Sequence, residues 1–230
     1  MPERPWRVAV FDSGSALPKA AAVTQSRRFV DEGDRVLEQP PIADPVGHGT
    51  MVASIIAGAC RPVELLLAQV LNERARCTPA TLAAATIWAL EQRAELLHFS
   101  LGLPHDRAVL ASAIAAATAA GVIVIAAAPA RGLTAYPAAY PGVIRTTGDA
   151  RCNDAQVSFL DSAAADFGAC AMHQTPAGQI SRGASIGAAH VSRYIVTHLP
   201  AGLAVSAVYE SLVRRAAFHG PERHRPAASV

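Results

Sequence analysis

Three polar side chains in this sequence stand at positions where they could do chemistry together. Asp12 directly follows an apolar segment, His48 lies between two glycines at a helix start, and Ser185 opens a later helix. A serine hydroxyl becomes a nucleophile when an imidazole takes its proton, and a carboxylate orients that imidazole and stabilises its charged form. These residue types therefore indicate acyl transfer, with Ser185 as nucleophile, His48 as base and later acid, and Asp12 as the orienting group.

Each of these residues also has an ordinary structural explanation. Ser185 could be an N-cap, Asp12 could complete a turn with Gly14, and a lone histidine is usually structural or solvated. The residues around Ser185 favour chemistry, because small neighbours admit a substrate backbone and a helix start favours a developing anion. His190 lies five residues after Ser185, on the far side of the same helix, and is interpreted as structural.

Alternating apolar strands and helical segments must position these residues. Strands are expected at residues 7–11, 63–71, 96–99, 122–128 and 143–147, and helices at 48–58, 80–92, 108–120, 185–199 and 204–217. Residues 15–45 are predicted as a surface excursion with one strand near 35–37, and residues 157–160 and 163–171 as short strands or irregular structure. This alternation predicts an α/β fold with a central, mostly parallel sheet and helices on both faces.

Length and charge narrow the class of protein. The 230 residues fit one domain, predicted over residues 1–219, and residues 220–230 are predicted as a disordered tail. A net charge of +2 indicates neither a nucleic-acid nor a membrane partner, and no apolar segment has the length and helical character to span a bilayer. No basic-then-apolar leader opens the sequence, so a chain of this extent is expected in the cytoplasm.

The four cysteines leave two alternatives open. Cys60, Cys77, Cys152 and Cys170 form no CxxC and match no zinc spacing, so no metal or other cofactor is expected. Free thiols are expected in a reducing compartment. The pairs Cys60–Cys77 and Cys152–Cys170 remain the alternative, since each could join neighbouring segments.

Five segments, in one order from about residue 6 to 200, resemble the subtilisin-like serine protease family, peptidase family S8. They are VFDSG at 10–14, HGT at 48–50, FSLG at 99–102, AYP at 135–137 with YPGVI at 140–144, and GASIGAAHV at 183–191, which is similar to the family's GTSMASPHV. The order Asp12, His48, Ser185 is that of subtilisin. The resemblance implies a three-layer subtilisin-like fold and cleavage of a peptide or protein substrate by these three residues.

The resemblance also implies where a substrate would bind. The peptide would lie as an added strand along Ser100, Leu101 and Gly102. The segments bordering the specificity pocket supply the remaining expected substrate-binding residues: Ala128, Ala130, Arg131 and Ala135. Arg131 at the pocket rim suggests an acidic or polar residue before the cleaved bond.

The sequence departs from the family at the oxyanion site. Ala130 stands where the family has a donating Asn, and Ala184 stands where it usually has Thr. Either turnover is slow or another donor substitutes: Arg131 is close enough in sequence to be a candidate, and Asn72 and Asn153 are weaker ones. Residues 59–62 leave no room for the family's calcium loop, and no prodomain precedes Asp12 in this sequence.

Two functions follow from these observations. The first is a slow and selective intracellular serine endopeptidase that matures a dedicated precursor peptide, favoured by the full Asp12, His48 and Ser185 set. The second is a catalytically impaired pseudoprotease, or a peptide-binding or tailoring protein on the same scaffold, favoured by the missing oxyanion donor. The sequence does not indicate an oligomeric state.

Overall fold

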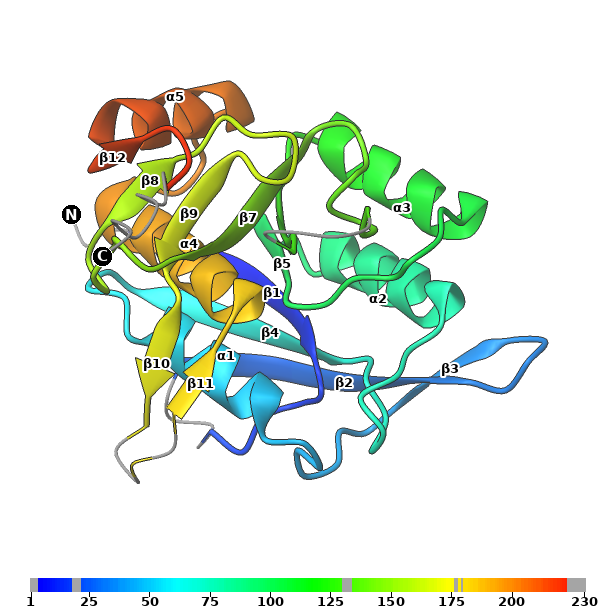
Figure 1. Cartoon of the computed structure of the whole chain (residues 1–230). Helices are drawn as coiled ribbons and strands as arrows, with labels where there is room; N and C mark the ends of the chain where they lie inside the picture. Colours follow the sequence, from blue (N-terminus) through cyan, green and yellow to red (C-terminus); the bar gives the residue numbers. More distant parts are fainter. Residues whose placement is uncertain (1–3, 18–21, 130–133, 176–177, 179, 223–230) are drawn as a thin grey trace, which may run out of the picture.

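The structure is a computed structural model that describes residues 4–17, 22–129, 134–175, 178 and 180–222. Its strands are β1 Trp6–Asp12, β2 Val23–Asp31, β3 Val36–Gln39, β4 Val63–Gln69, β5 Leu96–Phe99, β6 Ile123–Ala127, β7 Val143–Asp149, β8 Val157–Phe159, β9 Phe167–Cys170, β10 Met172–Gln174, β11 Ile180–Arg182 and β12 Phe218–His219. Its helices are α1 His48–Ala57, α2 Pro79–Glu91, α3 Ala108–Ala119, α4 Ala184–His198 and α5 Val205–Arg215. The expected alternation of strands and helices is therefore present (Figure 1).

A ten-stranded sheet forms the centre of the molecule, in the order β12-β8-β9-β7-β6-β5-β1-β4-β2-β3. The pairs from β2 through β4, β1, β5, β6 and β7 to β9 are parallel, and β2–β3 and β8–β9 are antiparallel. In β1, Val8 lies between Leu65 of β4 and Leu96 of β5. This sheet confirms the predicted α/β class, and it places the C-terminal ends of β1 and β5 side by side.

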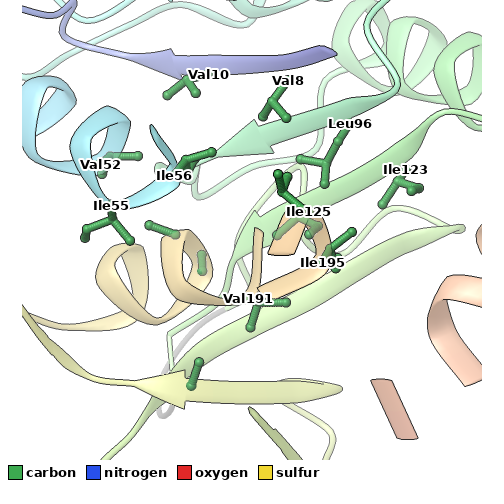
Figure 2. Close-up of a cluster of buried hydrophobic side chains, with 14 of the residues drawn as sticks. Val8, Val10, Val52, Ile55, Ile56, Leu96, Ile123, Ile125, Val191 and Ile195 are labelled. Atoms are coloured by element: carbon green, nitrogen blue, oxygen red, sulfur yellow. The ribbon is translucent and has the colours of Figure 1, made fainter. Parts of the chain in front are cut away.

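Helices cover both faces of the sheet. On one face α1 and α4 pack over β1, β5 and β6, with Val52, Ile56 and Ile195 among the buried side chains between them (Figure 2). On the other face α2 and α3 lie over Phe11 and Phe99, whose rings stack with centroids 4.1 Å apart. Apolar residues point to both faces because helices bury both sides of a parallel sheet.

Four strands were not predicted from the sequence. Residues 23–31 form β2, where an irregular excursion was expected, and β10–β11 and β12 were also missed. The segment VTQSRRFVD is only partly buried, since β2 lies near the sheet edge, and its pairing with β4 and β3 rather than an apolar run makes it a strand. Its polar composition therefore concealed it.

Two further expectations concern the tail and the cysteines. The Gly220 N–H donates to the Phe159 carbonyl over 2.9 Å, while residues 223–230 of the predicted tail lie outside the described residues. All four cysteines are free thiols, so neither of the two possible disulfides is present. No helix in the described ranges combines the length and the apolar character that crossing a membrane requires.

Candidate active site

Asp12 ends β1, the strand flanked by β4 and β5, and its side chain is buried. Its Oδ1 accepts the Ser13 N–H at 2.7 Å and the Ser13 hydroxyl at 3.1 Å, and its Oδ2 accepts the Ser100 hydroxyl. A buried carboxylate needs such donors, because an unpaired charge away from water is costly. Asp12 is therefore held in one orientation at the C-terminal edge of the sheet.

His48 is the first residue of α1, and its ring faces this carboxylate. The Nδ1 atom lies 2.8 Å from Oδ2 and 3.0 Å from Oδ1 of Asp12, so the ring N–H donates to the carboxylate. This hydrogen bond raises the pKa of His48, burial opposes it, and the negative charges of Asp12 and Asp44 add to the increase. The Asp12 contact leaves Nε2 as the nitrogen that could accept a proton.

Two glycines explain how α1 comes this close. Gly47 has φ 79°, a left-handed conformation that glycine adopts at little cost. A Cβ on Gly49 would lie 2.2 Å from the Gly14 carbonyl oxygen, so only glycine permits the contact with the turn after β1. The sequence HGT thus places the imidazole against Asp12 because its second residue has no side chain.

Ser185 is the second residue of α4 and lies across the site from β5. Its hydroxyl donates to the Ser100 carbonyl oxygen over 2.7 Å; within the described residues its hydrogen bond goes there and not to His48. Two residues later, a Cβ added to Gly187 would lie 2.2 Å from the Thr147 carbonyl oxygen, so α4 packs directly on β7. Its small residues therefore set the height of Ser185 above the sheet.

Ser100 connects these groups, a role that sequence reasoning missed. Its buried side chain donates to Asp12, while its carbonyl accepts from Ser185. The predicted role of Ser100 was substrate binding through its backbone. Its place directly after β5, beside the end of β1, was the signal for the added contact, because parallel strands bring their C-terminal ends to one edge.

The other expected substrate-binding residues fall into two groups. Leu101 is half-buried and Gly102 exposed, and a Cβ on Gly102 would lie 2.9 Å from the Ala135 Cβ, so Gly102 and Ala135 face each other. Ala128 and Ala135 both line a cavity of about 750 Å³. Ala130 and Arg131 lie outside the described residues.

Two of the predicted substitute oxyanion donors, Asn72 and Asn153, take part in local turns, and the third, Arg131, lies outside the described residues. The Asn72 Oδ1 accepts the N–H groups of Arg74 and Arg76, and the Asn153 Oδ1 accepts the Ala155 N–H. Ala184, which precedes Ser185, has no side-chain donor. Ser185 lies in the first turn of α4, where the backbone N–H groups and the helix dipole favour an anion.

His190 lies away from these groups. It is buried on α4, and burial lowers its pKa to about 4. Its ring centroid lies 6.1 Å from that of His173 on β10. Among the described residues, no three His, Cys, Asp or Glu side chains come together in a way that could hold a metal ion.

Comparison with known proteins defines the class. The family model described as Subtilase family, Peptidase S8, matches residues 6–196, and the chain belongs to this family. It is 30% identical over 164 residues to Subtilisin BL of Lederbergia lenta, covering 66% of this chain and 58% of that protein. It is 29% identical over 149 residues to the Thermostable alkaline protease of Halalkalibacterium halodurans, covering 60% and 40%. It thus spans about half the length of these curated relatives.

Proposed function

We propose that this chain is a serine endopeptidase that cleaves a peptide substrate with Asp12, His48 and Ser185. The observation that supports this most directly is the contact between His48 Nδ1 and the buried Asp12 carboxylate, 2.8 Å, at the sheet edge that Ser185 also faces. This contact leaves Nε2 free to act as a base. The subtilase membership of the chain supports the same assignment.

The first chemical step requires a rotation of the Ser185 side chain. In the resting arrangement its hydroxyl donates to the Ser100 carbonyl. Turning towards His48 Nε2 lets the imidazole take the proton as the oxygen attacks the substrate carbonyl. Asp12 then stabilises the imidazolium, which returns the proton to the leaving amine. The substrate would lie as an added strand along Leu101 and Gly102.

A slow and selective enzyme fits this site better than a general digestive one. The family's Asn, which would donate a hydrogen bond to the tetrahedral oxyanion, is replaced by Ala130 in this sequence, and alanine has no side-chain donor. In subtilisin, removal of that donor costs about 10²–10³ in kcat. Such an enzyme suits the maturation of one dedicated precursor peptide. The resemblance to the family assigns Arg131 to the specificity pocket, so we propose a preference for an acidic or polar residue before the cleaved bond.

The alternative function is a catalytically impaired peptide-binding or tailoring protein. The hydrogen bond from Ser185 to the Ser100 carbonyl supports this alternative, because it keeps the hydroxyl away from the base. The alanines at positions 130 and 184 support it as well. A carbonyl contact in the resting state and a hydroxyl turned to the base in the substrate complex would reconcile this geometry with the enzyme.

A fluorophosphonate probe separates the two functions. Such a probe phosphonylates a serine oxygen only when a base activates it. We expect one modified site, at Ser185, that is lost in Ser185→Ala and at least 10²-fold slower in His48→Ala. Absence of labelling at millimolar probe, with folding of the protein shown by circular dichroism, would favour the peptide-binding alternative.

A further inference from the structure

Asp44 lies four residues before His48, and its carboxylate accepts four hydrogen bonds. Its Oδ1 accepts the N–H groups of Val46 and Gly47 at 3.1 and 2.8 Å. Its Oδ2 accepts the N–H and the hydroxyl of Thr50 at 2.8 and 2.6 Å. Four donors therefore surround one half-buried side chain beside the first turn of α1.

These contacts complete the N-terminus of α1. The first N–H groups of a helix have no partner inside the helix, and Gly47, the N-cap, has no side chain to supply one. Asp44 accepts the third of them, from Thr50, and the Ser13 hydroxyl accepts the second, from Gly49, at 3.0 Å. The end of α1 that carries His48 is thus held from outside the helix.

The same network reaches the other side of the site. The Thr50 hydroxyl oxygen accepts the Ala16 N–H at 3.0 Å, so the carboxylate, the helix and the loop after β1 are connected. Asp12 lies at the start of that loop, and its Oδ1 accepts from Ser13. Besides the His48–Asp12 contact itself, two hydrogen bonds therefore join the segments that carry the carboxylate and the imidazole of the proposed triad. One runs from the Gly49 N–H to the Ser13 hydroxyl, and the other runs from the Ala16 N–H to the Thr50 hydroxyl, which Asp44 holds.

We propose that Asp44 is a positioning residue for the catalytic base: its carboxylate holds the first turn of α1 so that His48 stays opposite Asp12. This proposal rests on the function proposed for His48 above. The negative charge of Asp44 near the start of α1 also interacts favourably with the helix dipole and so stabilises this end of the helix.

Asp44 acts on His48 by its charge as well. The charged groups that influence the imidazole are Asp12 at the end of β1 and Asp44 in the loop before α1. The imidazole in turn helps to lower the pKa of the buried His98 of β5, for which burial is the main cause. The hydrogen bond with Asp12 is the largest cause that raises the pKa of His48, and the Asp44 charge adds to it. Hydrogen bonds from Thr50, Ser13 and backbone N–H groups outweigh burial and lower the pKa of Asp44, so the carboxylate is ionised wherever His48 titrates.

The test is an NMR titration of His48 in the full chain, which does not require turnover. Asp44→Asn keeps the size of the side chain and removes its charge, and Asp44→Ala removes the contacts as well. Asp31→Asn is the matched control, because Asp31 accepts one backbone N–H, from Gly33, and one threonine hydroxyl, from Thr78, without influencing His48. The His48 signal is assigned by its loss in His48→Gln.

We expect the pKa of His48 to fall by about half a unit in Asp44→Asn, the size for one charge several ångströms away in a partly solvated site. In Asp44→Ala the low-field proton signal of the Nδ1–H that donates to Asp12 should also broaden by exchange with solvent. Asp31→Asn should change neither. A His48 pKa and Nδ1–H signal that match the wild type in both Asp44 variants would overturn the proposal, even if the variants are less stable.

The outcome is distinguishable from failure of the proposed function. If wild-type Ser185 does not react with the fluorophosphonate, the peptidase assignment fails, while the titration still reports whether Asp44 positions His48. If Ser185 reacts, the acidic limb of its labelling rate should move to lower pH in Asp44→Asn, because a base of lower pKa stays neutral further into acid. A limb that does not move would contradict the charge contribution.

Discussion

The hydrogen bond from Ser100 to Asp12 offers a direct test of how the site is held. In Ser100→Ala the buried carboxylate loses one donor and keeps those from Ser13 and His48. A hydrogen bond to a charged group contributes about 1.5–3 kcal/mol. For a domain of this size, each kcal/mol corresponds to roughly 2–4 °C in Tm, so a decrease of about 3–12 °C is expected.

The matched control for this substitution is Ser158→Ala. The buried Ser158 hydroxyl donates to the buried Asp149 carboxylate over 2.6 Å, a contact of the same kind between β8 and β7. Both variants should lose similar stability in scanning calorimetry. Only Ser100→Ala should slow the labelling of Ser185, by about 5- to 30-fold if 1–2 kcal/mol of orientation is lost. Equal labelling rates in the two variants, or no loss of stability in Ser100→Ala, would refute this reasoning.

Three further predictions follow from the same geometry. Gly187→Ala places a Cβ where the carbonyl of β7 lies, so α4 must shift; we expect about 1–3 kcal/mol of lost stability in denaturant unfolding and slower labelling. Burial lowers the pKa of His190 to about 4, so the folded state disfavours its protonation and stability should fall as pH drops from about 6.5 towards 4; His190→Leu should flatten that dependence in pH-dependent thermal unfolding. Ala130→Asn should raise the labelling rate, up to the ~10² that subtilisin gains from this donor, and an unchanged rate would mean that another group donates.

The residues that carry the proposed chemistry were predictable because each stands in a distinctive local pattern. Asp12 follows an apolar strand, and His48 and Ser185 are surrounded by glycines and alanines at helix starts. Close packing explains those patterns: Gly49 and Gly187 each lie where any Cβ would meet backbone. At these positions the local composition reflects close tertiary contacts. The parallel sheet was predictable in the same way, because strands that are buried on both faces have continuous apolar sequences.

The groups that support the site were less visible, because their roles depend on contacts between distant segments. Ser100 reaches Asp12 across 88 positions of sequence. Asp44 is near His48 in sequence, but its importance comes from the N–H groups that Gly47, as a side-chain-free N-cap, leaves without a partner. The strand β2, next to the edge strand β3, was missed on similar grounds, since its pairing partners rather than its polar residues make it a strand.

The proposed triad is thus assembled from two helices that approach one sheet edge independently. Contacts of Gly49 and Asp44 fix α1, and contacts of Gly187 fix α4. Ser100 lies between them and touches both halves, through its hydroxyl to Asp12 and its carbonyl to Ser185. Moving one helix should therefore separate nucleophile from base without unfolding the other half. For this reason substitutions at Asp44 should act on the titration of His48, whereas Gly187→Ala should act on the reactivity of Ser185 and leave that titration unchanged.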